Sequence, residues 1–261
     1  MMDAKLVWHT WRKILRDEML QQRVFDPTWS GANDTSLSPA EQDVIAAYAD
    51  SRDRAKWFIE NYQFRLVNSF INALETGAPL TLRALLNSGF EMAELSHRFL
   101  RQHHWHDYGP RVYQYGSEAL DWLIEKQHLL GLSAALVDLI WLEKTTVTLY
   151  LSLQNRPGLV TAGRAEYQQS GMARLYRSRY QLTNWLRDKK SLGLHEPAIG
   201  EENLLVVLPD YSSRHKYLRV PDRCAALFNA PSLANVQPEH QDELHLARLL
   251  ACNALVSGEA R

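Results

Sequence analysis

The sequence has no excess of charge of either sign, because 29 lysines and arginines nearly balance 30 aspartates and glutamates. Proteins that hold nucleic acid or anionic lipid through bulk charge carry a clear positive excess. The formal net charge of −1 at pH 7 over 261 residues therefore argues against either partner for the chain as a whole.

Long apolar runs are missing as well. No stretch reaches the roughly 18 consecutive apolar residues that cross a membrane as a helix. The first residues, "MMDAKLVWHTWRKIL", also lack the apolar run of a signal peptide. We therefore expect a cytoplasmic protein without a membrane-spanning segment.

Cysteine and clustered glycine are scarce. The two cysteines, Cys224 and Cys252, are far apart and lack Cys-x-x-Cys spacing, which predicts two reduced thiols. The 12 glycines form neither a phosphate-binding loop nor the Gly-x-Ser-x-Gly turn of a nucleophilic serine. We expect no catalytic residue in this chain.

Histidine is concentrated in residues 101–116, "RQHHWHDYGPRVYQYG". A metal needs three or four converging ligands, whereas adjacent residues seldom surround one ion. No His-Glu-x-x-His motif occurs, and Gly109-Pro110 is expected to end the preceding helix. We interpret the segment as a loop that packs helices or faces a partner. A self-sufficient metalloenzyme that uses His103, His104 and His106 is the alternative.

Apolar periodicity predicts helices through most of the first 153 residues. Ser38, Pro39 and Glu41 have the spacing of a capping box with proline at the first helical position. The predicted helices are 5–22, one that begins at Pro39, 55–75, 82–86, 90–102, 118–130 and one from a Ser133 cap to 153. Their carboxylates, among them Glu118, Asp121, Asp138 and Glu143, are expected to be solvated or salt-bridged.

The composition changes after residue 163. Residues 164–190 are rich in arginine and aromatic residues, and a helix over 171–187 fits them; such a helix suits a protein partner, nucleic acid or plain surface. Residues 191–200 have the composition of a linker. "NLLVVLPDYSSRHKYLRVP" then predicts two strands and a turn, and a helix within 238–258 closes the chain.

These elements predict a mainly α protein. A helical domain of residues 1–190 is followed by a small α+β domain, a strand hairpin plus a helix, in residues 200–261. A two-stranded sheet leaves open edges, to which an extended peptide can add a strand. Covering of that edge by the chain's own helix is the equal alternative.

Residues 57–145 resemble the N-terminal domain of a family labelled as DNA-binding. The similar segments are "WFIENYQFRLVNSFINAL", "FEMAELSHRFLRQHH", "YQYGSEALDWL" and "LVDLIWLE". The family's Tyr-Gly corresponds to Tyr115-Gly116, and its Asp-Leu-Ala-x-Leu-Glu helix to residues 138–143. His103-His104 stands where the family has His-Pro, and Ile140-Trp141 also departs from the pattern.

Members of that family often accompany a TIM-barrel protein that carries two or three iron ions, as in the methanobactin and 3-thiaglutamate pathways. In such pairs the barrel supplies the iron and the chemistry, and the partner holds a ribosomally made precursor peptide. The resemblance thus implies an accessory subunit without a cofactor of its own, with the 3-thiaglutamate type favoured. The alternative is a DNA-binding transcriptional regulator.

On this hypothesis the peptide adds a strand in the C-terminal domain, next to cationic and aromatic side chains that suit an acidic leader. The predicted peptide-binding residues are Leu204, Leu205, Val206, Val207, Leu208, Arg214, Lys216, Tyr217 and Arg219. The predicted residues of the interface with the iron enzyme are His103, Trp105, Tyr115, Arg174, Arg177 and Tyr180.

Overall fold

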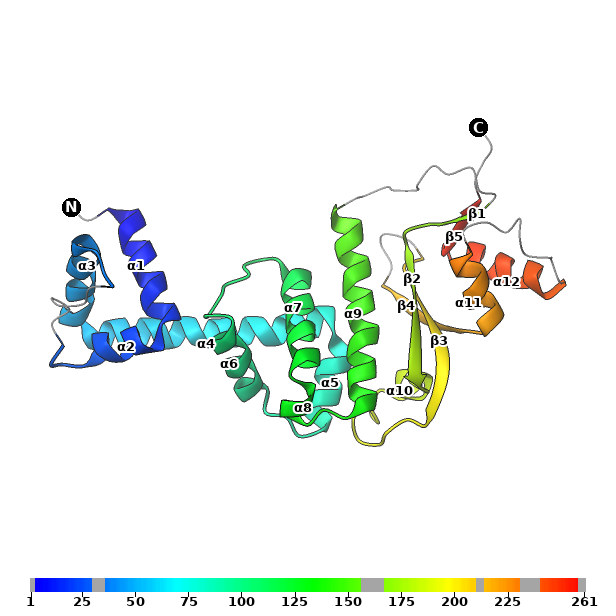
Figure 1. Ribbon diagram of the computed structural model, residues 1–261, viewed down its shortest axis with the longest axis horizontal. Coiled ribbons are helices and arrows are strands. Elements are labelled where there is room, and N and C mark those ends of the chain that lie inside the picture. The colour runs from blue at the N-terminus through cyan, green and yellow to red at the C-terminus, as the bar shows by residue number, and fades with distance from the viewer. Residues whose placement is uncertain (1–2, 30–35, 156–166, 210–213, 231–239, 258–261) are drawn as a thin grey trace. The chain divides into compact units, whose positions relative to one another are not determined.

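The computed structural model describes residues 3–29, 36–155, 167–209, 214–230 and 240–257, and it is mainly helical, as predicted (Figure 1). The chain forms two compact units. Unit 1 comprises Met1–Ile71 with Glu91–Gly109, and unit 2 comprises Asn72–Phe90 with Pro110–Arg261. None of the described helices is both long and apolar enough to cross a membrane.

Unit 1 is built from helices. The single helix predicted over 5–22 is wrong, because the chain bends at Asp17. The backbone of Asp17 is extended (φ −113°, ψ 101°), and its side chain accepts a hydrogen bond from the backbone N–H of Leu20 at 3.0 Å. An aspartate in this conformation begins a new helix. The helices of unit 1 are α1 Ala4–Arg16, α2 Glu18–Phe25, α3 Pro39–Asp50, α6 Met92–Gln102 and the greater part of α4 Arg52–Gly77.

The start of α3 confirms the predicted capping box. A carboxylate oxygen of Glu41 accepts from the backbone N–H of Ser38 at 2.9 Å, and the Ser38 hydroxyl accepts from the backbone N–H of Glu41. Lys13 of α1 reaches the same carboxylate at 2.5 Å. The hydrogen bonds from Lys13 and Ser38 lower the pKa of Glu41 to about 2. Glu41 therefore ties α1 to α3 as an ion.

Unit 2 combines helices with two small sheets. Its helices are α5 Pro79–Asn87, α7 Val112–Glu125, α8 Gln127–Leu130, α9 Ala134–Asn155, α10 Thr183–Arg187, α11 Asp222–Asn229 and α12 His240–Ala251. Strands β2 Ala173–Tyr180, β3 Ile199–Val207 and β4 Lys216–Val220 form an antiparallel sheet in the order β2-β3-β4. Strand β1 Tyr167–Gln169 pairs with β5 Leu255–Ser257. The predicted hairpin is thus confirmed as β3 and β4.

The helix predicted over 171–187 is wrong, because residues 173–180 form β2 and only the last five residues, in α10, are helical. The side chains of β2 alternate between two environments: Ala173 and Leu175 pack in the core with Leu205, whereas Tyr176 and Ser178 bond to α9. Pairing with β3, which follows later in the chain, overrides the helical propensity of the segment. The predicted boundary between the helical domain and the α+β domain, at residues 190–200, therefore falls between the paired strands β2 and β3.

The predicted linker 191–200 is also wrong, since it is packed. Leu192 is buried, its carbonyl oxygen accepts from the Asn87 side chain at 2.6 Å, and the Trp185 indole donates to the carbonyl oxygen of His195 at 2.7 Å. Gly193 has φ +74°, and a Cβ there would lie 2.5 Å from the carbonyl oxygen of Ala84. The segment anchors α10 and β3 to α5.

The three-stranded sheet is covered on both faces. Leu205 and Val207 pack with residues of α11 and α12, and the opposite face bonds to α9, which runs beside β2 in Figure 1. This double coverage explains why the "LLVV" of β3 is a continuous apolar run rather than an alternating one. Cys224 of the covered core and Cys252 are free thiols.

Candidate functional site

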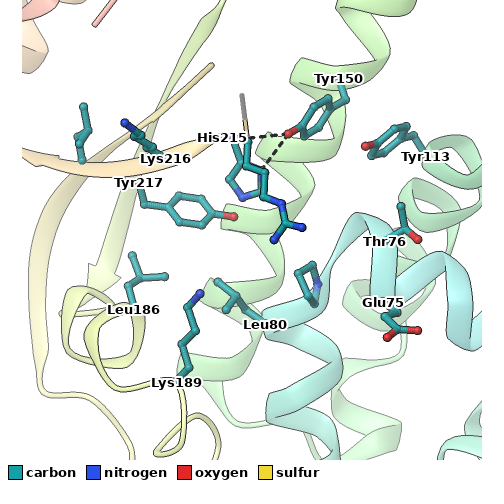
Figure 2. A pocket seen from close by; sticks show the side chains of 13 residues that line it. Glu75, Thr76, Leu80, Tyr113, Tyr150, Leu186, Lys189, His215, Lys216 and Tyr217 are labelled. Carbon is teal, nitrogen blue, oxygen red and sulfur yellow. Dashed lines mark hydrogen bonds between the residues drawn. The ribbon is translucent and has the colours of Figure 1, made fainter. Parts of the chain in front are cut away.

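Unit 2 contains a polar cleft of about 790 Å³ between its helices and the start of β4 (Figure 2). Its walls come from the junction of α4 and α5, from α7 and α9, from α10 and the residues after it, and from β4 with the two residues before it. The lining residues are Glu75, Thr76, Pro79, Leu80, Tyr113, Tyr150, Leu186, Lys189, Arg214, His215, Lys216, Tyr217 and Leu218. We call it the β4 cleft.

Positive charge dominates the β4 cleft. Lys189, Arg214 and Lys216 contribute cations, and Glu75 is the carboxylate of its lining. No described carboxylate forms an ion pair with Lys189 or Arg214, and both side chains are exposed. Unpaired cations that share a cavity make it attractive to an anion.

Aromatic rings form one side of the β4 cleft. The rings of Tyr113 and Tyr150 stack with their centroids 4.8 Å apart and an angle of 13° between their planes. The His215 ring lies edge-on to Tyr150 at 5.8 Å and to Tyr217 at 5.0 Å. Such contacts hold each ring in one orientation and give the wall a defined shape.

Two hydrogen bonds join the Tyr150 hydroxyl to His215, as Figure 2 shows. The Tyr150 hydroxyl accepts from the backbone N–H of His215 at 3.4 Å and lies 3.1 Å from ring Nδ1. Nδ1 is therefore occupied by Tyr150, and Nε2 is the ring nitrogen that remains for another partner. Burial, together with the charges of Lys189 and Arg214, lowers the pKa of His215. Both effects favour the neutral form of the ring.

A buried carboxylate lies behind the β4 cleft. Glu143 of α9 accepts from the backbone N–H groups of Leu80 and Thr81, at 2.9 and 2.6 Å, and so caps the first turn of α5. Burial raises the pKa of Glu143 to about 7, although these hydrogen bonds and Lys189 act in the opposite direction. The neighbouring Tyr217 hydroxyl is 3.0 Å from that of Thr146, and burial raises the pKa of Tyr217.

A second buried carboxylate joins α9 to the sheet. Asp138 accepts from the Tyr176 hydroxyl at 2.5 Å, from the backbone N–H groups of Arg179 and Tyr180 at 3.0 and 3.3 Å, and from the Ser178 hydroxyl. The expectation of solvated or salt-bridged carboxylates is therefore wrong for Asp138 and Glu143. Asp121 does form an ion pair, with Lys144.

The residues predicted to bind a peptide divide into two groups. Arg214, Lys216 and Tyr217 line the β4 cleft together, and Arg219 lies 3.7 Å from the buried Glu202 carboxylate. The residues of 204–208 are buried instead. Residues 204–207 belong to the central strand β3, whose two edges are already paired with β2 and β4. Their backbone N–H and C=O groups therefore cannot pair with an added peptide strand. The outer strands of the described sheet are β2 and β4.

Two of the residues predicted for the enzyme interface are interior. Trp105 and Tyr115 are each only 3% exposed, so their side chains pack inside the protein. His103 is half-buried and stacks on Phe99 at 4.1 Å. The other three, Arg174, Arg177 and Tyr180, lie on β2, where Arg177 pairs with Glu201.

Residues 101–109 of the histidine-rich segment belong to unit 1 and are held by hydrogen bonds within it. Asp107 accepts from the Tyr62 hydroxyl at 2.6 Å and from the backbone N–H of Gly109 at 2.8 Å. His104 and Trp105 have a positive φ of 50°, which turns the chain sharply after α6. Among the described residues, no group of three or more His, Cys, Asp and Glu converges as metal ligands.

Unit 1 carries an apolar groove of about 660 Å³ on α1, α3 and α4, which we call the aromatic groove. It is lined by Ala4, Val7, Trp8, Trp11, Tyr48, Phe58 and Tyr62. Trp8 and Phe58 are each 51% exposed, although apolar side chains of this size are usually buried.

Comparison of the chain with protein-family models and with curated proteins finds no match.

Proposed function

We propose that this protein is a non-catalytic subunit that binds an iron-dependent TIM-barrel enzyme and presents a ribosomally made precursor peptide for cysteine modification. The proposal rests on the resemblance of residues 57–145 and favours the 3-thiaglutamate type over the methanobactin type. The iron and the chemistry belong to the partner enzyme.

The observation that carries the peptide-binding role is the position of β4. It is an outer strand of the described sheet, and its Lys216, Tyr217 and Leu218 also line the β4 cleft. A peptide that pairs with β4 gains backbone hydrogen bonds, while cations beside the strand attract acidic side chains. We therefore assign peptide binding to the outer edge of β4, one strand away from residues 204–207.

The aromatic groove is the surface that we assign to the iron enzyme. Tryptophan and tyrosine are enriched among the residues that contribute most to protein interfaces, and contiguous exposed apolar surface commonly marks a binding site. We assign the interface to this groove and not to Trp105 and Tyr115, because the side chains of both residues are buried.

The test is affinity purification of the tagged chain from its native host, with mass spectrometry and metal analysis of what accompanies it. We expect an iron-bearing TIM-barrel protein in near one-to-one ratio, together with a short peptide. Lys216→Glu should retain the barrel protein and lose the peptide, whereas the exposed Arg187→Glu on α10 should retain both.

Two further variants test whether the aromatic groove binds the iron enzyme. Trp8→Ala combined with Phe58→Ala should lose the barrel protein, and Leu129→Ala, which removes another exposed apolar side chain, should keep it. A chain that emerges alone or with DNA would overturn the proposal, and DNA would favour the transcriptional regulator.

A further inference from the structure

Lys189, Arg214 and His215 all line the β4 cleft. Lys189 and Arg214 have no carboxylate partner among the described residues, and none of the hydrogen bonds of these residues uses Nε2 of His215, whose Nδ1 is bound by Tyr150. Lys189 and Arg214 are both close enough to His215 to lower its pKa. The three side chains therefore share one cavity and act on one another electrostatically. Figure 2 shows Lys189 extending toward Tyr217 and Leu80 within it.

The β4 cleft also has an apolar wall. Leu80, Leu186 and Leu218 line it together with the ring of Tyr113. Ligand cavities commonly combine apolar walls with a few convergent polar groups, and about 790 Å³ lies within their usual size range. A bare inorganic ion would leave most of this space and the apolar wall unused.

We propose that the β4 cleft binds an organic carboxylate, whose charged group is held by Lys189, Arg214 and the Nε2–H of His215 and whose apolar part lies against the leucines and Tyr113. This site requires neither the iron enzyme nor strand pairing at β4.

The surrounding carboxylates favour a singly charged ligand. Glu143 lies behind the cavity, within the electrostatic reach of Lys189, and Glu75 lines its wall. A dianionic phosphate group would meet stronger repulsion from them than a carboxylate would. The planar guanidinium of Arg214 also matches a carboxylate with two parallel hydrogen bonds.

The test is calorimetric titration of the full chain with four probes: hippurate, benzoate, neutral hippuramide and inorganic phosphate. We expect saturable binding of a carboxylate and much weaker binding of hippuramide and phosphate. Lys189→Gln and Arg214→Gln should each weaken binding about tenfold or more, because each removes a charged hydrogen bond. Both side chains are exposed, so the fold should persist, which circular dichroism checks.

Lys190→Gln is the matched control, since Lys190 is the exposed neighbour of Lys189 and does not line the cleft. Hippurate bound more tightly than benzoate would indicate a peptide C-terminus as the carboxylate, and the reverse order would indicate a small aromatic acid. The site is overturned by equal binding of hippuramide or phosphate, or by an equal loss in Lys190→Gln. A dissociation constant above about 10 mM for both acids would also overturn it.

Discussion

Glu143→Gln tests whether one buried carboxyl group makes unit 2 less stable at alkaline pH. The folded-state pKa of Glu143, about 7, is above its ordinary value of 4.5. The folded protein therefore binds this proton more tightly than the unfolded chain does. The resulting stabilisation is fully present below about pH 4.5 and is lost as the pH rises through about 7.

The expected size follows from the two pKa values. Between pH 5 and pH 8 the contribution of Glu143 to the free energy of unfolding should fall by about 2.5 kcal/mol. Glutamine has no proton to lose, so Glu143→Gln should remove this dependence. It also replaces one of the two acceptors for Leu80 and Thr81, which should lower stability by about 1–3 kcal/mol at every pH.

The assay is urea unfolding of the native protein and the variant at pH 5, 6.5 and 8, with hydrogen exchange of the α5 amides as a local readout. The free-energy difference between the two proteins should change with pH by the stated amount. Glu125→Gln is the control, because that carboxylate is exposed on α7. If the difference in the free energy of unfolding between the two proteins did not change with pH, the pKa of Glu143 would not be raised. Burial would then not outweigh the hydrogen bonds that lower this pKa.

Three further predictions concern stability. Asp138→Asn should lower the free energy of unfolding by about 2 kcal/mol and speed amide exchange in β2, because an amide cannot accept from all the donors at Arg179 and its neighbours. Glu41→Gln should abolish a part of the acid destabilisation, about 1–2 kcal/mol once solvent screening is counted, that the native protein suffers as the pH falls from about 4.5 to 2. A urea series over that range measures it, and equal pH slopes would contradict it. Gly193→Ala should cost more than about 2 kcal/mol in thermal unfolding, since its Cβ would meet the Ala84 carbonyl at a positive φ; an unchanged melting temperature would show that the turn relaxes.

The β4 cleft could be only partly predicted from the sequence. Arg214, Lys216 and Tyr217 are close together in sequence, and their cationic and aromatic character indicates binding. Tyr113 and Lys189 carry no such signal, because they are far away in the chain and enter the site only through folding. The roles of Asp138 and Glu143 were missed for the same reason. A carboxylate on a helix is usually solvated, and its burial depends on the segments that pack against it.

The sequence by itself determined the elements whose signals are local. The capping box at Ser38 places the start of α3, the apolar stripe of residues 58–74 places α4, and the β3–β4 hairpin follows from two apolar runs around a turn. Only the tertiary structure decided that residues 173–180 form a strand, that β3 is central, and that the donors around His215 meet in one cavity. Short-range signals act through neighbouring backbone groups, whereas strand pairing, burial and pKa depend on residues that are distant in the chain.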